Sequence, residues 1–394
     1  MSARLLLFDL YTGGHHRTYL ETLARAWVTG PERGLLEMAV STAFAAEHPD
    51  FVRWMDVQDA GTVKLVPIAL PEPLREGDMG LGDVLRQDLL HGRVLSRLLR
   101  ERNPESVLAM YFDHLQASLA LRRVKQPSGG RVPISGIYFR PSFHYQGEPL
   151  VTRFRKRTLL SAALANPAVN KILCLDPFAV EARDHAKLQW LPDGLDPSAV
   201  GEAARAVRER WGVPPDHKLL LFFGVVSARK GIHEVLAALR RLQTLSTLVI
   251  AGRIPAAERA AVEAAIAESR AEASVIHQDR YLRDEEVQDL MAAADVALVA
   301  YRHHIGSSHV LIRAAAAGTP VVGPAYGLMG KLIRENALGA AVDTDQPDEL
   351  AREIDRMLDQ AGHEASFDKD RALQFAELNN VEHFISTIFG AVLQ

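Results

Sequence analysis

The sequence predicts an α/β protein built from two doubly wound domains in series. Short apolar runs alternate with longer amphipathic segments along the chain, which is the pattern of βα units that form a parallel sheet. A stretch rich in Pro, Gly and Asp separates two series of such units, and 394 residues suffice for about two or three domains. Ligands are then expected at the carboxyl ends of the strands, in a cleft between the domains.

In the first half, four apolar runs mark strands, at residues 4–10, 106–112, 132–139 and 171–175. Gly13 and Gly14 follow the first run and precede an amphipathic helix. Glycine lets the backbone come close to a ligand at a helix N-terminus, so we predict that both contact ligand. A plain tight turn is the alternative.

Polar residues also follow two later strands of the first half. Arg140 and His144 come after the run at 132–139, and we predict that both enter the cleft as substrate contacts. Asp113 and His114 follow the run at 106–112 and are comparable candidates. The alternative for each histidine is a surface or capping role.

The second half repeats the pattern more regularly, with a helix expected at 284–294. The predicted strands are residues 218–224, 246–252, 274–278, 295–301 and 319–323. We divide the chain into a first domain at 1–195, a second at 196–371, and a helix at 372–394 that returns to the first domain.

Two cations, Arg229 and Lys230, lie between a strand end and Gly231, which opens a helix. Cations beside a helix N-terminus at the carboxyl edge of a sheet form an anion site. We predict that they contact phosphate. A solvated surface pair is the alternative.

A second candidate anion site precedes the helix that starts near residue 309. Ser307 and Ser308 are the expected N-cap, and His309 shares a helix face with Arg313. We predict that all four bind phosphate. Alternatively, Arg313 is structural and pairs with Asp295 or Glu335.

Composition excludes several functions. The net charge of −4 argues against nucleic-acid binding over the whole surface, and the single cysteine, Cys174, allows no internal disulfide.

We find no signal peptide and no apolar run of membrane-spanning length, and we expect a cytoplasmic protein. Adjacent histidines, as at His15–His16, do not share a helix face, so we predict no metal site.

The segment at 150–160 mixes aliphatic and aromatic residues with Arg153, Arg155, Lys156 and Arg157. One interpretation is a contact with an anionic membrane at the inner face or with a phosphorylated acceptor. The other is the solvated face of a surface helix.

Three stretches of the second half resemble the donor-binding domain of GT-B glycosyltransferases, specifically retaining family 4. They read "FFGVVSARKGIHEVLAAL", "YLRDEEVQDLMAAADVALVAY" and "SSHVLIRAAAAGTPVVGPAYGLMGKLIRENALGAAV", and "WLPDGLD" is similar to the interdomain linker of that family. The resemblance implies two Rossmann-like domains facing each other across a cleft. It also implies transfer of a sugar from a nucleotide diphosphate donor to an acceptor, with no metal or other cofactor; the acceptor, whether a saccharide or a lipid-linked compound, is not identified.

The resemblance also implies roles for individual residues. Lys230 matches the lysine that contacts the diphosphate, and Arg229 replaces an arginine that the family places at the position of Val225. A histidine near the transferred sugar suggests His144. The family's base pocket points to three residues after the strand at 274–278, namely Arg280, Tyr281 and Leu282.

The sequence departs from the family at its two glutamates, whose positions hold Ile305 and Arg313. Arginine only donates hydrogen bonds and cannot replace a carboxylate that accepts them from ribose hydroxyls. Either the ligand is more anionic than usual, or the chain is a catalytically silent module that binds a phosphorylated ligand or a protein. A sugar-nucleotide epimerase is a third alternative, but it would need a pair of acids that we do not find.

Overall fold

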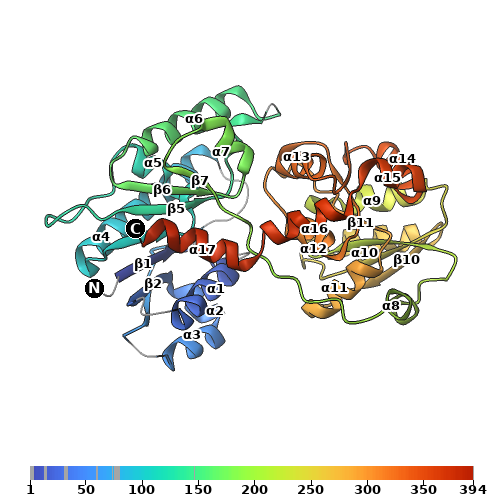
Figure 1. Ribbon diagram of the computed structural model, residues 1–394, viewed down its shortest axis with the longest axis horizontal. Coiled ribbons are helices and arrows are strands. Elements are labelled where there is room, and N and C mark those ends of the chain that lie inside the picture. The colour runs from blue at the N-terminus through green and yellow to red at the C-terminus, as the bar shows by residue number, and fades with distance from the viewer. Residues whose placement is uncertain are drawn as a thin grey trace. The chain divides into compact units, whose positions relative to one another are not determined.

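The structure is a computed structural model that describes residues 4–12, 16–30, 34–58, 61–72, 74, 80–145 and 147–393. The chain forms two compact units (Figure 1). The N-terminal unit comprises Met1–Pro192 and Glu382–Gln394, and the C-terminal unit comprises Asp193–Val381. The divisions therefore fall a few residues before the predicted 195/196 boundary and about ten residues after the predicted 371/372 boundary.

The described part of the N-terminal unit contains a parallel sheet with strand order β3-β2-β1-β4-β5-β6-β7. Strands β1, β2, β4 and β5 are buried on both faces, as parallel strands covered by helices are, whereas the edge strand β3 exposes Lys64 and Pro67. Their bounds are β1 Arg4–Asp9, β2 Leu35–Ser41, β3 Val63–Ile68, β4 Ser106–Ala109, β5 Ile134–Tyr138, β6 Val169–Cys174 and β7 Leu188–Trp190.

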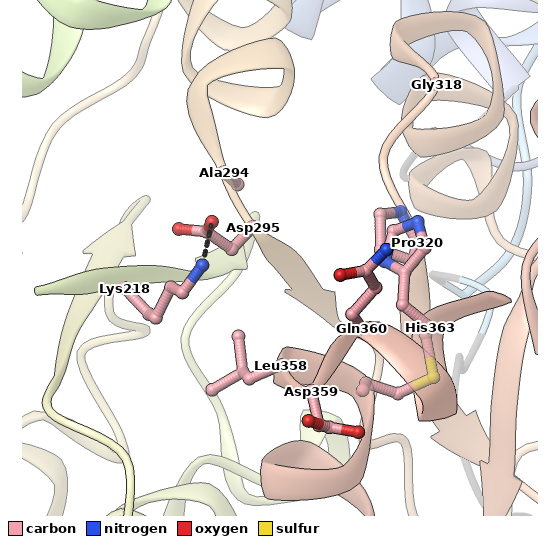
Figure 2. A pocket seen from close by; sticks show the side chains of 10 residues that line it. Lys218, Ala294, Asp295, Gly318, Pro320, Leu358, Asp359, Gln360 and His363 are labelled. Atoms are coloured by element: carbon pink, nitrogen blue, oxygen red, sulfur yellow. Dashed lines mark hydrogen bonds and ion pairs between the residues drawn. The ribbon is translucent and has the colours of Figure 1, made fainter.

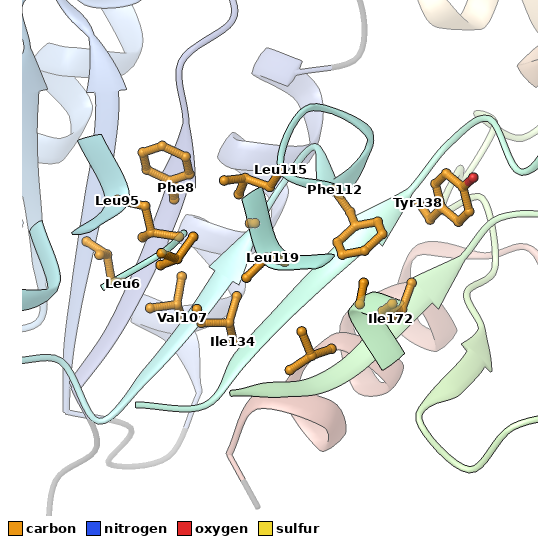
Figure 3. Packing of buried hydrophobic residues seen from close by; sticks show 14 of the residues in the cluster. Leu6, Phe8, Leu95, Val107, Phe112, Leu115, Leu119, Ile134, Tyr138 and Ile172 are labelled. Atoms are coloured by element: carbon orange, nitrogen blue, oxygen red, sulfur yellow. The ribbon is translucent and has the colours of Figure 1, made fainter. Parts of the chain in front are cut away.

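Helices cover both faces of this sheet. Their bounds are α1 His16–Thr29, α2 Thr42–Glu47, α3 Pro49–Asp56, α4 Leu81–Arg102, α5 Gln116–Ala120, α6 Leu150–Leu164, α7 Pro177–Arg183 and α17 Val381–Val392, with 3-10 turns η1 Phe112–His114 and η2 Ser142–His144. Successive residues of β1 point to opposite faces. Figure 3 shows Leu6 and Phe8 in the layer that contains Leu95 of α4 and Leu119 of α5.

Helix α17 belongs to the other layer of the N-terminal unit. Its apolar residues Phe384 and Ile388 are buried with Tyr19 of α1. The side chain of Asn170 donates a hydrogen bond of 2.9 Å to the carbonyl of Ala391. Helix α17 thus lies in the N-terminal unit, whereas the preceding helix α16 (Lys369–Leu378) packs against α12 (His309–Ala317) in the C-terminal unit.

The described part of the C-terminal unit contains a second parallel sheet, with order β10-β9-β8-β11-β12-β13. The strands are β8 Lys218–Phe223, β9 Ser246–Ala251, β10 Ser274–Gln278, β11 Val296–Leu298, β12 Val321–Pro324 and β13 Gly339–Val342. The helices are α8 Ala204–Trp211, α9 Ile232–Leu239, α10 Arg259–Arg270, α11 Asp284–Ala293, α12 His309–Ala317, α13 Gly327–Glu335, α14 Pro347–Leu358, α15 Gln360–Ser366 and α16 Lys369–Leu378, with 3-10 turn η3 Ala228–Lys230.

A close backbone approach fixes the connection from β8 to α9. Gly231 has φ +79°, and a Cβ there would collide with the carbonyl oxygen of Ala300, just after β11. A second contact joins the same two segments: the backbone N–H of Arg302 donates a 2.9 Å hydrogen bond to the carbonyl of Arg229. The turn that carries the two predicted cations is therefore held against the end of the neighbouring strand.

Gly231→Ala should destabilise the C-terminal unit more than Gly212→Ala does. Gly212 has φ +76°, but no atom lies within 4 Å of the place that a methyl group would take, so its substitution costs only the left-handed backbone strain, about 1 to 2 kcal/mol. Gly231→Ala adds the collision with Ala300, and we expect at least about 3 kcal/mol in total.

Native-state hydrogen exchange of the β8 and β11 amides measures this loss for the C-terminal unit alone. Equal losses for the two variants would show that the contact with Ala300 does not constrain the turn.

Candidate functional site

The carboxyl end of β8 carries the two predicted cations of the C-terminal unit. Gly224 follows the strand with φ +104°, and the Lys230 ammonium lies over the position that a side chain would take there. Lys230 Nζ is 3.4 Å from the carbonyl oxygen of Phe223. Glu258 anchors the loop by accepting a 2.7 Å hydrogen bond from the N–H of Ala228. The cation of Lys230 is therefore held at the strand end.

Tyr301 connects this loop to the start of α12. The centre of its ring lies 5.1 Å from Lys230 Nζ and 5.5 Å from Arg229 Cζ, within the range of cation–π attraction. Its hydroxyl is 3.0 Å from Ser308 Oγ. We call Arg229, Lys230, Tyr301 and Ser308 the Tyr301 group. It brings two cations and a helix N-terminus together, as expected for an anion site.

Helix α12 begins as predicted. Ser308 is the N-cap, and its hydroxyl accepts a hydrogen bond of 3.3 Å from the N–H of Val310. Ser307 lies beside it, and its carbonyl oxygen is 3.2 Å from His304 Nε2. His309 Nε2 is 3.0 Å from a carboxylate oxygen of Asp193, so that its imidazole is oriented by the segment at which the unit starts.

Arg313 forms an ion pair with Asp284, the first residue of α11. Burial disfavours ionisation of Asp284, but hydrogen bonds from Arg313 and Ser198 outweigh it and hold its pKa below the usual value. The sequence suggested Asp295 or Glu335 as the partner of Arg313. The structure shows Asp284 instead, and Asp295 pairs with Arg208. Nη1 of Arg313 is buried and has no partner in the described part of the chain.

The residues predicted for the nucleotide base follow β10, immediately before α11. Arg280 forms a 2.7 Å ion pair with Glu286, and this hydrogen bond lowers the pKa of Glu286 to about 2. Tyr281 is 83% exposed, whereas Leu282 is only 5% exposed and leaves little surface for a ligand. Asp284 and Arg313 lie next to this loop.

In the N-terminal unit, His144 is enclosed by protein groups. Its Nδ1 lies 2.9 Å from the carbonyl oxygen of Pro141, and its Nε2 lies 3.2 Å from a carboxylate oxygen of Asp176. The same carboxylate caps α7 and accepts a 2.6 Å hydrogen bond from the hydroxyl of Tyr145. Arg140 is exposed, and its backbone N–H donates to Asp113 at 3.1 Å.

The structure brings together a group of residues at the carboxyl ends of β1 and β4, of which the sequence had singled out only His114 as a candidate. Asp9, the last residue of β1, is 2% exposed, and one of its carboxylate oxygens lies 2.6 Å from His16 Nδ1. Rings of Tyr11, Tyr111 and His114 pack around them, with Tyr11 centred 5.3 Å from His16 and 5.0 Å from His114.

We call Asp9, Tyr11, His16, His91, Tyr111 and His114 the histidine cluster. Strands β1 and β4 are neighbours in the sheet. From β1 the chain adds β2 and β3 on one side, and from β4 it adds β5, β6 and β7 on the other side. Ligands bind at such a topological switch point in open α/β sheets. The predicted Gly13 and Gly14 lie outside the described residues.

Burial keeps two imidazoles of the histidine cluster neutral. It lowers the pKa of His91, and it lowers that of His114 to about 3 with help from neighbouring cationic groups. His91 Nδ1 is 2.8 Å from the carbonyl oxygen of Gln87, so this nitrogen carries the proton. His91 Nε2 and His114 Nδ1 are buried and lack partners in the described residues. Neutral imidazoles and phenols suit the binding of hydroxyl groups.

A pocket in the C-terminal unit lies at the opposite, amino edge of the sheet (Figure 2). Its lining includes Lys218, which starts β8, Asp295, which precedes β11, and Pro320, which precedes β12. Lys218 Nζ is 3.4 Å from Asp295, which also pairs with Arg208. Its one basic strand residue, Lys218, is already paired with an acid, and the pocket lies at the edge of the sheet opposite the predicted anion site.

Within the described ranges, no group of three or more His, Cys, Asp or Glu side chains could hold a metal ion. None of the helices in these ranges is both long and apolar enough to cross a membrane.

Comparison with known proteins shows what the C-terminal unit is similar to. The family model for glycosyl transferases group 1 matches residues 204–372. The 2-deoxystreptamine glucosyltransferase of Streptomyces kanamyceticus is 29% identical over 61% of this chain and 60% of its own length. The D-inositol 3-phosphate glycosyltransferase of Xylanimonas cellulosilytica is 31% identical over 42% of this chain and 41% of its own. The chain therefore spans about three fifths or less of these relatives.

Solved structures match the fold of nearly the whole chain. Anabaena HepE, in complex with UDP and glucose, has a TM-score of 0.65 at 15% identity, covering 98% of each chain. Sucrose-phosphate synthase from Thermosynechococcus elongatus has a TM-score of 0.67 at 18% identity, covering 99% of this chain and 98% of that one. The chain thus has the GT-B fold of two Rossmann-like units, and residues 204–372 of its C-terminal unit match the glycosyl transferases group 1 family.

Proposed function

We propose that the chain transfers a sugar from a nucleotide diphosphate sugar, bound by the C-terminal unit, to a hydroxylated acceptor. The Tyr301 group carries this proposal. It places Lys230, Arg229 and the N-terminus of α12 around one point at the carboxyl edge of the sheet. The leaving group of such a donor is a diphosphate, and these are the groups that stabilise its developing charge.

The solved relatives support a nucleotide donor, since HepE structures contain UDP, UDP with glucose, or UDP-glucose. Two cations and a helix N-terminus can neutralise a diphosphate without a bound metal ion. We therefore propose metal-independent transfer. The family and fold comparisons do not favour the catalytically silent alternative.

Arg313 and Asp284 together replace the acid that the family resemblance places at position 313. Nη1 of Arg313 is available to donate, and the neighbouring Asp284 carboxylate can accept a hydrogen bond from a hydroxyl. The pair lies beside the loop of Arg280 and Tyr281. We assign it to the nucleoside half of the donor, and Lys230 to the diphosphate half.

The histidine cluster supports an acceptor rich in hydroxyl groups. The relatives are named for 2-deoxystreptamine and D-inositol 3-phosphate, both ring compounds with several hydroxyls. Asp9 fixes the orientation of His16, which can then hydrogen-bond an acceptor hydroxyl. Two neutral imidazoles, those of His91 and His114, can also hydrogen-bond hydroxyl groups. The ring of Tyr111, which stacks on His114, adds a flat surface for a ring compound.

We propose retention of configuration by same-face attack. Near the Tyr301 group, the carboxylates of Glu234 and Asp345 are both paired with Arg302 and are not presented as nucleophiles. The diphosphate oxygen that leaves the sugar would accept the proton of the attacking hydroxyl. Stabilisation of that diphosphate by Arg229 and Lys230 then carries most of the catalysis.

Lys230→Ala should weaken UDP binding about tenfold to hundredfold, because one charge-assisted contact to phosphate is lost. Isothermal calorimetry in the presence of EDTA measures the affinity and tests metal independence together. Lys218→Ala is the matched control, since Lys218 begins the same strand at the opposite edge and pairs with Asp295. Equal affinities of wild type and Lys230→Ala would refute the diphosphate site.

Asp284→Asn and Arg313→Leu should weaken UDP binding about tenfold while leaving the affinity for pyrophosphate unchanged. Pyrophosphate has no ribose or base, so it reports only the diphosphate half of the site. Lys230→Ala should weaken both ligands. Competition between pyrophosphate and a fluorescent UDP analogue provides the comparison, and parallel losses for both ligands would contradict our assignment of Arg313.

His16→Ala should lower sugar transfer to a cyclitol acceptor about a hundredfold without changing UDP affinity, because only acceptor positioning is affected. Transfer from UDP-glucose to a panel of cyclitols and sugars, followed by NMR, yields the rate and the configuration of the new bond. His185→Ala provides the matched control outside the cluster. An inverted product would refute retention, and an unchanged rate would refute the role of His16.

A further inference from the structure

Helix α6 of the N-terminal unit exposes an apolar surface that nothing in the described structure covers. Leu150 is 77% exposed, Val151 81% and Phe154 73%, and together they form the first turns of the helix. Positions three and four apart share a helix face, so the exposed Arg157 lies one turn beyond Phe154 on the same side. We call Leu150, Val151, Phe154 and Arg157 the α6 patch.

The rest of α6 shows that this exposure is local. Leu160, Ala163 and Leu164 at the C-terminal half are buried against the unit. The first half is held by polar contacts on its inner side, where Lys156 Nζ donates to Ser142 Oγ at 2.7 Å and to the carbonyl of Arg140 at 2.9 Å. The helix is thus fixed in place with the α6 patch facing outward. Single exposed apolar residues are ordinary, but three adjacent ones are not.

The charged residues of α6 itself are all basic, and the nearby acid Glu148, two residues before the helix, accepts a hydrogen bond from Ser142. The helix sequence contains no acidic residue, and Arg153, Arg155 and Arg157 form no ion pair with any described residue, although Arg153 Nε donates a 3.4 Å hydrogen bond to the carbonyl of Phe143. The exposed Arg140 lies near its first half, since its carbonyl accepts from Lys156. Elsewhere on the unit, surface arginines such as Arg25 are paired with acids. Unpaired cations around the patch match an anionic surface.

We propose that the α6 patch docks the protein on an anionic membrane surface. Apolar side chains flanked by arginines are the combination that inserts a helix face at the lipid headgroup level, with the cations at the phosphates. An acidic protein partner would satisfy the charges, but it would not by itself account for the protruding Val151 and Phe154. The inference goes beyond the proposed sugar transfer, and its test needs neither donor nor acceptor.

Sedimentation with vesicles tests this proposal. Wild-type protein should bind vesicles of phosphatidylglycerol and phosphatidylcholine, bind pure phosphatidylcholine vesicles much more weakly, and lose affinity as salt rises. Val151→Ser combined with Phe154→Ser should lower the partition coefficient about tenfold or more, and Arg157→Ala about fivefold. Val57→Ser is the matched control, because Val57 is 78% exposed beside α3, at the opposite edge of the sheet.

A label at position 154 tests the contact itself. Cys174 is the single cysteine and is buried, so Phe154→Cys can be labelled selectively with an environment-sensitive fluorophore. Its emission should shift to the blue on addition of anionic vesicles, whereas a label on Val57→Cys should not respond. Absence of vesicle binding by the wild type, or binding unchanged by the double substitution, would overturn the proposal; circular dichroism verifies that each variant is folded.

Discussion

The site in the C-terminal unit depends on one close approach, that of Gly231 to the carbonyl of Ala300. Only a glycine in a left-handed conformation fits there, and it turns the chain from β8 into α9. This contact sets the distance between the cation loop and the residues after β11. Arg229 and Lys230 therefore lie over Tyr301, whose hydroxyl reaches Ser308 at the start of α12. A backbone constraint thus positions a charged site.

Electrostatics explains how the site can work with an unusual set of residues. The family resemblance implies an acid at the position of Arg313, and the pairing of Arg313 with Asp284 brings a carboxylate close to this position. The low pKa of Asp284 keeps that carboxylate ionised at neutral pH. Lys230 has no comparable acid partner among the described side chains, and it is held by a backbone carbonyl and by the Tyr301 ring. Lys230, the cation at the strand end, is therefore the one that we assign to the proposed diphosphate.

The sequence allowed prediction of those parts of the site that depend on local rules. Strand ends, a glycine turn and a serine N-cap located Lys230 and Ser308 correctly at the carboxyl edge. It did not reveal the Arg313–Asp284 pair, whose members are 29 residues apart, or the packing of His16 on Asp9 beside His91. Such contacts arise only when helices pack. Strands β2, β3, β7 and β13 were also missed, because short or mixed apolar runs resemble helix segments.

Hydrogen exchange with mass spectrometry on the full chain, with and without UDP, tests the central claim most directly. We predict that UDP protects the backbone amides of two segments at the carboxyl edge of the C-terminal sheet, residues 224–232 and 306–312. The amino-edge pocket, including the segment at 357–363, should exchange at an unchanged rate. Protection of that pocket instead, or of neither carboxyl-edge segment at saturating UDP, would contradict a donor site built on the Tyr301 group.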